Sequence, residues 1–217
     1  MSDIFREVDE EVRREQLKQL WDRWGSYFVV LAFVVVLGIA GWRGWEWWQA
    51  KQAAETGTAF EAALALSEAG KHEEAEAAFS KIAAESSSGY RLLARFREAA
   101  ELARKDRGAA VKAYDAIAAD TSQTLLLRQL ASVRAALLLV DIAPLSEMVT
   151  RLEPITAAEH PLRHTARELL ALAAWRNGDV AAARKWLDMI ANDAETPSGT
   201  RARAELLSAI TGAEGKG

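Results

Sequence analysis

The chain has 217 residues, of which 50% are hydrophobic and 27% are charged, and its formal net charge is −4. These proportions exclude a disordered chain and a membrane protein with many spans. The chain contains no cysteine, which excludes disulfides, thiolate zinc sites and cysteine nucleophiles. The negative net charge argues against nucleic-acid binding. Only four prolines and 13 glycines interrupt a sequence rich in alanine, the strongest helix former, so an all-α fold is predicted.

Residues 1–23 predict a short cytoplasmic segment. Acidic side chains alternate there with Arg13, Arg14 and Lys18, and apolar residues recur between them. This pattern fits an amphipathic helix that leads into the next segment, and it is too short to fold alone.

Residues 24–42 form an uncharged run of 19 residues, which predicts a transmembrane helix. At about 1.5 Å per residue the run measures about 28 Å as a helix, against a hydrocarbon core of about 30 Å. A buried core helix normally keeps a polar stripe, and this run has none. Six of the eight tryptophans lie at its ends, where indole rings favour the headgroup layer. We therefore assign residues 24–48 to a transmembrane helix with a Trp-rich interfacial flank, and the expected anchoring residues are Trp21, Arg23, Trp24, Trp42, Arg43, Trp45, Trp47 and Trp48.

A cleaved signal peptide is the main alternative for this run. Gly38-Ile39-Ala40 offers the small residues that a cleavage site needs. However, the leading segment is long and acidic, and the apolar run exceeds the usual length of about 7–15 residues. Retention of the helix as an anchor is the favoured interpretation.

Lysine and arginine predict the orientation of the helix. Residues 1–23 contain five of them, whereas the twenty residues after the run contain only Arg43 and Lys51. Because positive charges stay cytoplasmic, the N-terminus is expected inside the cell and the C-terminal domain outside the membrane. The expected location is the bacterial inner membrane, with a single span and a periplasmic C-terminal domain.

Small residues cluster near the outer end of the span, at Gly38, Ala40, Gly41 and Gly44. Ala40 and Gly44 have the spacing that lets a second helix approach closely, which predicts a helix-packing face. Glycine is also common in membrane spans generally, so both interpretations stay open.

Residues 49–211 predict a periplasmic domain of helix hairpins. Helical segments of roughly 10–18 residues alternate there with short breaks that contain Gly, Pro, Asp or Ser. Four pairs are expected, at roughly 57–86, 88–119, 122–154 and 158–193, with a capping helix at about 199–211 and a flexible tail at 212–217.

One spacing of residue types repeats along this domain. Gly70 and Gly178 precede two copies at identical offsets. Each copy has a small residue, a large apolar residue four positions later and an isoleucine, and the repeat-packing residues are Ala75, Phe79, Ile82, Ala110, Tyr114, Ile117, Ala183, Leu187 and Ile190. The alanine lets two helix backbones meet closely, and the large residue fills the gap between neighbouring pairs. Gly70 and Gly178 lie 108 residues apart, which is three periods of 36. A period of about 34 residues is typical of tetratricopeptide repeats, and a degenerate copy is expected at 143–152. A generic Ala-rich bundle is the alternative.

Few residues suggest catalysis or metal binding. His160 and His164 have the spacing of a helical metal pair, but Pro161 lies between them and no third ligand stands out. No glycine loop for phosphate follows a strand pattern, and the serine run at 86–88 has no paired base. We therefore expect a non-enzyme without cofactor, metal or small-molecule substrate. A hydrolase would require a role for His160 or His164.

The first helices of the pairs are expected to line a concave face suited to peptides or partner helices. Arginines recur along these helices, and the candidate groove residues are Arg91, Arg95, Arg128, Arg167 and Trp175. A basic groove would receive acidic or unfolded segments. The simpler interpretation is that these arginines balance the many glutamates on exposed faces.

An acidic N-terminal segment and one span are followed by Gly41-Trp42-Arg43-Gly44-Trp45 and by degenerate repeats with a Gly178-Asp179 turn before Ala183-Arg184. This order resembles the YfgM-type ancillary subunit of the SecYEG translocon. The resemblance implies an inner-membrane protein with a periplasmic repeat domain, with the translocon and periplasmic chaperones as partners and with no catalytic residues. A scaffold for another cell-envelope or division complex is the alternative function.

Overall fold

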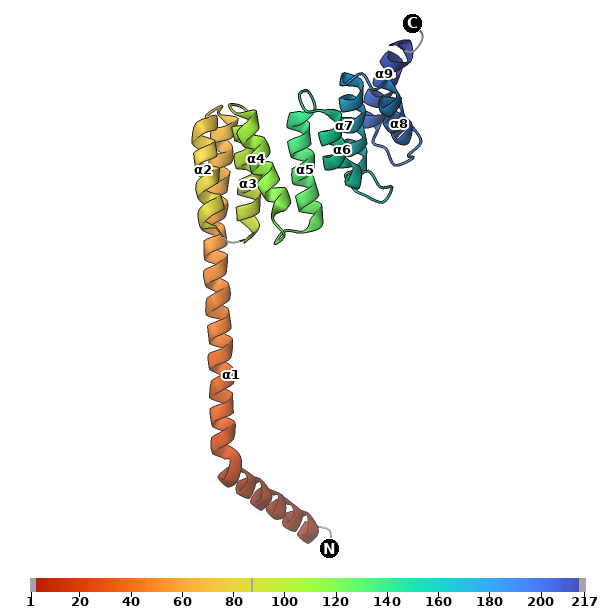
Figure 1. Cartoon of the computed structure of the whole chain (residues 1–217). Helices are drawn as coiled ribbons and strands as arrows, with labels where there is room; N and C mark the ends of the chain where they lie inside the picture. Colours follow the sequence, from red (N-terminus) through yellow and green to blue (C-terminus); the bar gives the residue numbers. More distant parts are fainter. Residues whose placement is uncertain (1–2, 87, 215–217) are drawn as a thin grey trace. The chain divides into compact units, whose positions relative to one another are not determined.

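The structure is a computed structural model that describes residues 3–86 and 88–214. Those residues form helices joined by turns and loops, and no strand occurs among them. The chain divides into two compact units, Met1–Glu55 and Thr56–Gly217, and the helices of each follow in chain order in Figure 1.

The first unit is occupied by the helix α1 (Asp3–Glu68), which continues into the second unit. Part of this helix is long and apolar enough to cross a membrane. Its large apolar side chains between Tyr27 and Ile39 are all more than half exposed, with Phe33 at 65%. A core helix buries such side chains against its neighbours, so the buried-core interpretation of this run is wrong.

In its described residues, 56–86 and 88–214, the second unit contains four helix pairs and a closing helix. The end of α1 pairs with α2 (His72–Glu85), α3 (Ser88–Leu102) with α4 (Arg107–Ala119), α5 (Leu125–Leu139) with α6 (Leu145–Leu152) and the short η1 (Glu153–Ile155), α7 (Arg163–Arg176) with α8 (Val180–Ala191), and α9 (Ser198–Glu214) closes the unit. The predicted all-α solenoid of about four hairpins with a C-terminal capping helix is confirmed. The predicted tail began at residue 212, but α9 continues to Glu214, and residues 215–217 lie outside the described residues.

The two glycines of the repeat pattern make the same turn. Gly70 and Gly178 have φ angles of 76° and 79°, in the left-handed region where a Cβ would be strained. The N–H of Lys71 donates to the oxygen of Leu66 at 2.9 Å, which closes the end of α1. An equivalent bond of 2.9 Å joins the residue after Gly178 to α7. Each glycine therefore ends the first helix of its hairpin and lets the turn donate hydrogen bonds to the last carbonyl groups of that helix.

The second helix of a pair packs between two first helices. One core cluster joins Ala63 of α1, Phe79 of α2 and Ala94 of α3. The next cluster joins α3, α4 and α5 around Tyr114, and the third extends from α5 to α9. Each hairpin is therefore stabilised mainly by its neighbours, as expected of a solenoid.

The degenerate repeat is carried by Met148, Leu152 and Ile155. They have the same spacing as the small, large and isoleucine positions of the other copies, and none is more than 1% exposed. Methionine occupies the position of alanine here, and Pro154 lies in η1 directly after α6. This copy therefore differs from the others in two ways: methionine replaces the alanine, and its helix is shorter.

Candidate protein-interaction surface

The nine repeat-packing residues lie on α2, α4 and α8, and all are buried, with Ile82 the most exposed at 6%. Their aromatic members contact rings on the first helices. The Phe79 ring centroid lies 5.3 Å from that of Phe60, and the Tyr114 centroid lies 6.0 Å from that of Phe96. These residues set the spacing between pairs and leave the first helices to present the surface.

A groove of about 410 Å³ crosses the first helices of the first three pairs. We call it the α3–α5 groove. The lining consists of apolar side chains from the end of α1, from α3 and from α5, with Tyr114 of α4 and two arginines, and its most relevant members are Leu92, Leu93, Phe96, Leu127, Leu130, Arg97 and Arg134. No aspartate or glutamate is among the lining residues.

The pKa of Tyr114 reflects both the burial and the positive charge of the groove. Burial raises the pKa of its phenol, and the guanidinium groups of Arg134 and Arg97 act in the opposite direction. The phenol donates a hydrogen bond of 3.4 Å to the backbone oxygen of Phe96. Both arginines are therefore close enough to the groove for their charge to act within it.

All four arginines predicted for a groove have partners within the chain. Arg91 donates two hydrogen bonds to the oxygen of Ser86, at 2.8 and 3.1 Å. Arg128 donates one of 2.8 Å to the oxygen of Ala118. These bonds hold the ends of α2 and α4 against the following first helix, so a role for these side chains in partner binding stays a prediction.

Arg95 forms an ion pair with Asp120, at 2.6 Å between Nη1 and Oδ2. Asp120 also accepts a 2.6 Å hydrogen bond from the hydroxyl of Ser122. Ser122, followed by Arg95, lowers the pKa of Asp120 to about 2. The carboxylate ties α3 to the turn after α4.

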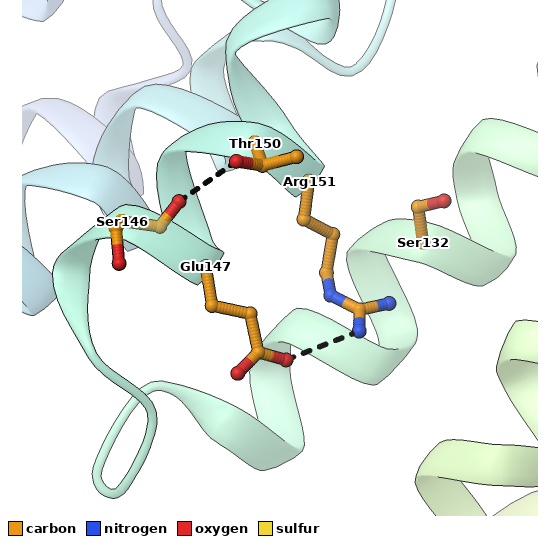
Figure 2. A pocket seen from close by; sticks show the side chains of 5 residues that line it. All are labelled: Ser132, Ser146, Glu147, Thr150 and Arg151. Atoms are coloured by element: carbon orange, nitrogen blue, oxygen red, sulfur yellow. Dashed lines mark hydrogen bonds and ion pairs between the residues drawn. The ribbon is translucent and has the colours of Figure 1, made fainter.

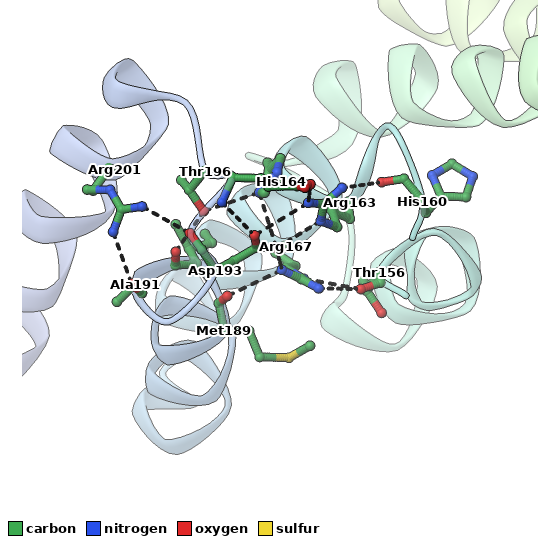
Figure 3. Close-up of polar contacts among 12 residues, drawn as sticks. Thr156, His160, Arg163, His164, Arg167, Met189, Ala191, Asp193, Thr196 and Arg201 are labelled. Carbon is green, nitrogen blue, oxygen red and sulfur yellow. Dashed lines mark hydrogen bonds and ion pairs between the residues drawn. The ribbon is translucent and has the colours of Figure 1, made fainter. Parts of the chain in front are cut away.

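Arg167 lies in a polar network at the base of α7 and α8, shown in Figure 3, and is only 4% exposed. Its Nε and Nη2 donate to the oxygen of Thr156 at 3.1 and 2.9 Å, and its Nη1 lies 2.8 Å from Asp193. Arg163 pairs with the same carboxylate at 2.8 Å. Arg163, with Arg167 in support, holds the pKa of Asp193 well below its usual range. Arg167 therefore joins two loops in the described structure. It also lines a shallow hollow of about 480 Å³ with Arg163 and Asp193, and its role in partner binding stays a prediction.

The two histidines considered for metal binding have protein partners instead. His160 Nε2 lies 2.8 Å from the amide oxygen of Gln129, and His164 Nδ1 lies 3.3 Å from the hydroxyl of Thr196. Burial, followed by the charge of Arg163, lowers the pKa of His164. Residues 3–86 and 88–214 contain no cluster of three His, Asp or Glu side chains suited to a metal ion.

Glu101, buried on α3, holds the turn between α1 and α2. It accepts a hydrogen bond of 2.5 Å from the hydroxyl of Ser67 and lies 2.8 Å from Nδ1 of His72. Both side chains contact the carboxylate, and no hydrogen bond joins Ser67 to His72 in the described structure. Glu101 therefore ties α3 to both helices of the first hairpin.

Trp175 lines a second groove, of about 280 Å³, between α7 and α9. The α7–α9 groove is strongly apolar, and Leu206 of its lining is 66% exposed. An ion pair between Glu168 and Arg203 closes one side, with Arg203 Nη2 at 2.8 Å from Glu168. The role of Trp175 in partner binding stays a prediction.

A polar hollow of about 550 Å³ lies between α5 and α6, and Figure 2 shows its lining side chains. Thr150 donates a hydrogen bond of 2.9 Å to the backbone oxygen of Ser146. Arg151 Nη2 lies 3.3 Å from Glu147, and Arg151 also pairs with Asp115 of α4. Its cation is thus neutralised by two carboxylates, and the hollow offers little to an anionic ligand.

In the first unit the predicted anchoring tryptophans are all exposed, from Trp48 at 47% to Trp42 at 69%. The ring centroids of Trp45 and Trp48 lie 5.3 Å apart, and the Lys51 ammonium lies 5.7 Å from the ring of Trp47. A Cβ added at any of the predicted packing glycines would meet nothing within 4 Å, so this face of α1 is open. Membrane anchoring and helix packing by these residues stay predictions.

The helix hairpins, their glycine turns and the grooves across the first helices define an α-solenoid of the kind that binds other proteins. A family model described as a tetratricopeptide repeat-like domain matches residues 18–185, and the chain belongs to this family. No curated protein and no solved structure shows a significant match to the chain. The family makes the chain a protein-interaction scaffold, a class of domain that is typically not catalytic.

Proposed function

We propose that this protein is an inner-membrane-anchored ancillary subunit of the SecYEG translocon. Its repeat domain would lie in the periplasm and link exported proteins to periplasmic chaperones. The observation that carries the proposal is that one family match covers both the apolar run and most of the hairpins. Because the matched residues begin at position 18, ahead of the run, the span is part of the family pattern. This supports an anchor that is retained with the domain.

Anchoring gives this architecture a physical advantage. The grooves on the repeat domain are small, and a single shallow groove binds a peptide weakly. A domain held at the membrane meets segments that emerge there at a high effective concentration, so weak contacts suffice. A membrane-anchored scaffold is therefore suited to transient capture during export.

Co-purification tests the proposal directly. The full chain, tagged at its C-terminus, is extracted in a mild detergent that keeps the translocon intact. We expect the translocon subunits to be recovered with it. Their absence under conditions in which the channel itself stays assembled would contradict the assignment.

Site-specific crosslinking separates the translocon from a division or envelope complex. A photoreactive residue is placed at Gly41 or Gly44, on the open face of α1, and a matched one at Val35 in the same helix. We expect channel subunits to be crosslinked from the glycine positions more strongly than from Val35. Crosslinks only to an unrelated envelope complex would favour the alternative function.

A further inference from the structure

Two arginines of the α3–α5 groove differ from nearly all others in the second unit. Among the described arginines of that unit, only Arg97, Arg107 and Arg134 have no hydrogen bond or ion pair to another described residue. Arg97 and Arg134 line the α3–α5 groove, and Arg107, the first residue of α4, does not. Two of these three unpaired arginines therefore lie in one recess.

The same two positions recur in register along the repeat. Leu93 and Arg97 on α3 are followed 37 residues later by Leu130 and Arg134 on α5. Residues four apart on a helix share a face, so each first helix presents a leucine and an arginine to the groove. A guanidinium stays charged at every physiological pH, and none of the described residues that line the groove is a carboxylate that could neutralise it. The recess combines an apolar floor with two fixed positive charges.

We propose that the α3–α5 groove binds a segment of a partner protein that carries both apolar and acidic side chains. Leucine- or phenylalanine-type residues would cover Leu93, Phe96 and Leu130, and aspartate or glutamate would pair with Arg97 and Arg134. The inference rests on the proposed function in one respect only, namely that the repeat domain meets a protein.

The shape of the site favours a peptide over an anionic membrane surface. Attraction to anionic lipid usually takes a cluster of several cations on a protruding surface. Here two cations border a recess that crosses three helices, and Leu93 is 52% exposed within it. Apolar side chains next to paired charges are typical of a segment bound in a groove.

Fluorescence anisotropy with the full chain in detergent micelles tests the inference. The probe is a labelled synthetic peptide in which leucine and phenylalanine alternate with glutamate, and its partner probe has glutamine at every glutamate. Arg97→Gln with Arg134→Gln is compared with Arg107→Gln, which removes the same kind of unpaired charge outside the groove. Leu93→Gln is compared with Leu125→Gln, since Leu125 is 64% exposed on α5 but does not line the groove. Circular dichroism checks that each variant keeps its helix content.

We expect the glutamate peptide to bind the unchanged chain and the Arg107→Gln and Leu125→Gln variants equally. The double arginine variant should bind it about tenfold more weakly, and the loss should shrink at high salt. Leu93→Gln should weaken both peptides by several-fold. Equal binding of the two peptides, equal binding by the double variant, or no binding at all would overturn the inference. A vesicle-binding assay with an anionic phospholipid adds one more outcome. If the double arginine variant still bound the glutamate peptide normally but no longer bound these vesicles, the inference would also be overturned.

These results are independent of the translocon test. Peptide binding that fails while translocon subunits still co-purify would remove the groove assignment alone. Peptide binding that follows the arginines while no translocon subunit is recovered would leave the groove in place and remove the translocon assignment.

Discussion

Replacing Phe79 by alanine should strongly destabilise the first hairpin. The ring is completely buried and meets Phe60 at 5.3 Å, and its other buried neighbours include Ala63, Ala75 and Ala94. Alanine side chains cannot rotate into the space that a phenyl group leaves. The loss should therefore be near the upper end of the range of about 3–5 kcal/mol for this change, because the cavity stays open.

The effect should also be local. Phe79 belongs to the core cluster of α1, α2 and α3, whereas α7, α8 and α9 share a different cluster. Urea unfolding of the full chain in micelles, followed by circular dichroism, measures the loss of free energy. Hydrogen exchange read by mass spectrometry locates it, and Leu125→Ala, at a 64% exposed position, is the control with a change within about 0.5 kcal/mol. A loss below about 1.5 kcal/mol, or equal loss of protection in α8 and α2, would refute this view of the packing.

Three further predictions concern the turns and polar contacts. Gly178→Ala should destabilise the protein by about 1–2 kcal/mol because the φ of Gly178 is 79°. Gly212→Ala inside α9 should instead stabilise it slightly. The urea midpoint should therefore fall for the first variant and rise for the second. Asp120 has its pKa lowered from 3.8 to about 2, so its stabilising effect should be complete above about pH 4 and disappear as the pH falls through about 2. Urea midpoints for the unchanged chain and Asp120→Asn should therefore converge over that interval. Asp193→Asn should lower the melting temperature more than Glu195→Gln, because Asp193 serves two arginines and Glu195 is 79% exposed; equal shifts would contradict the network.

The hairpins were predictable because their packing requires certain residue types at a spacing that repeats along the sequence. On α2, α4 and α8, an alanine, a large residue and isoleucine recur at a fixed spacing. The spacing survives in the third pair, but Met148 replaces alanine and Pro154 lies directly after the short α6. Residue types alone therefore predicted this copy only as a degenerate one, at 143–152. Its packing is set by neighbouring helices, which a single-sequence pattern does not contain.

The groove was predictable only in part. Arginine recurs on the first helices α3 and α5, whose side chains line the groove, but residue type alone does not say which way a side chain points. Arg95 and Arg97 are two residues apart, so they lie on nearly opposite faces of α3, and only Arg97 lines the groove. The signal that would have found it is the leucine four residues before each arginine, at Leu93 and Leu130.

The burial of Arg167 could not be predicted from the sequence alone. Its partners are an aspartate 26 residues later and a backbone oxygen 11 residues earlier, and they meet only when the α7–α8 hairpin has formed. An arginine on a first helix is expected to be solvated unless such a loop covers it. These contacts of Arg167 therefore depend on the tertiary structure.

The central claim is that the apolar run is a permanent membrane anchor for the hairpin domain. Alkaline extraction of cell membranes, followed by the intact mass of the protein, tests this most directly. The account predicts that the chain stays with the membrane pellet and has the uncleaved mass of 23.8 kDa. A soluble product whose mass shows that it begins after Ala40 would contradict it.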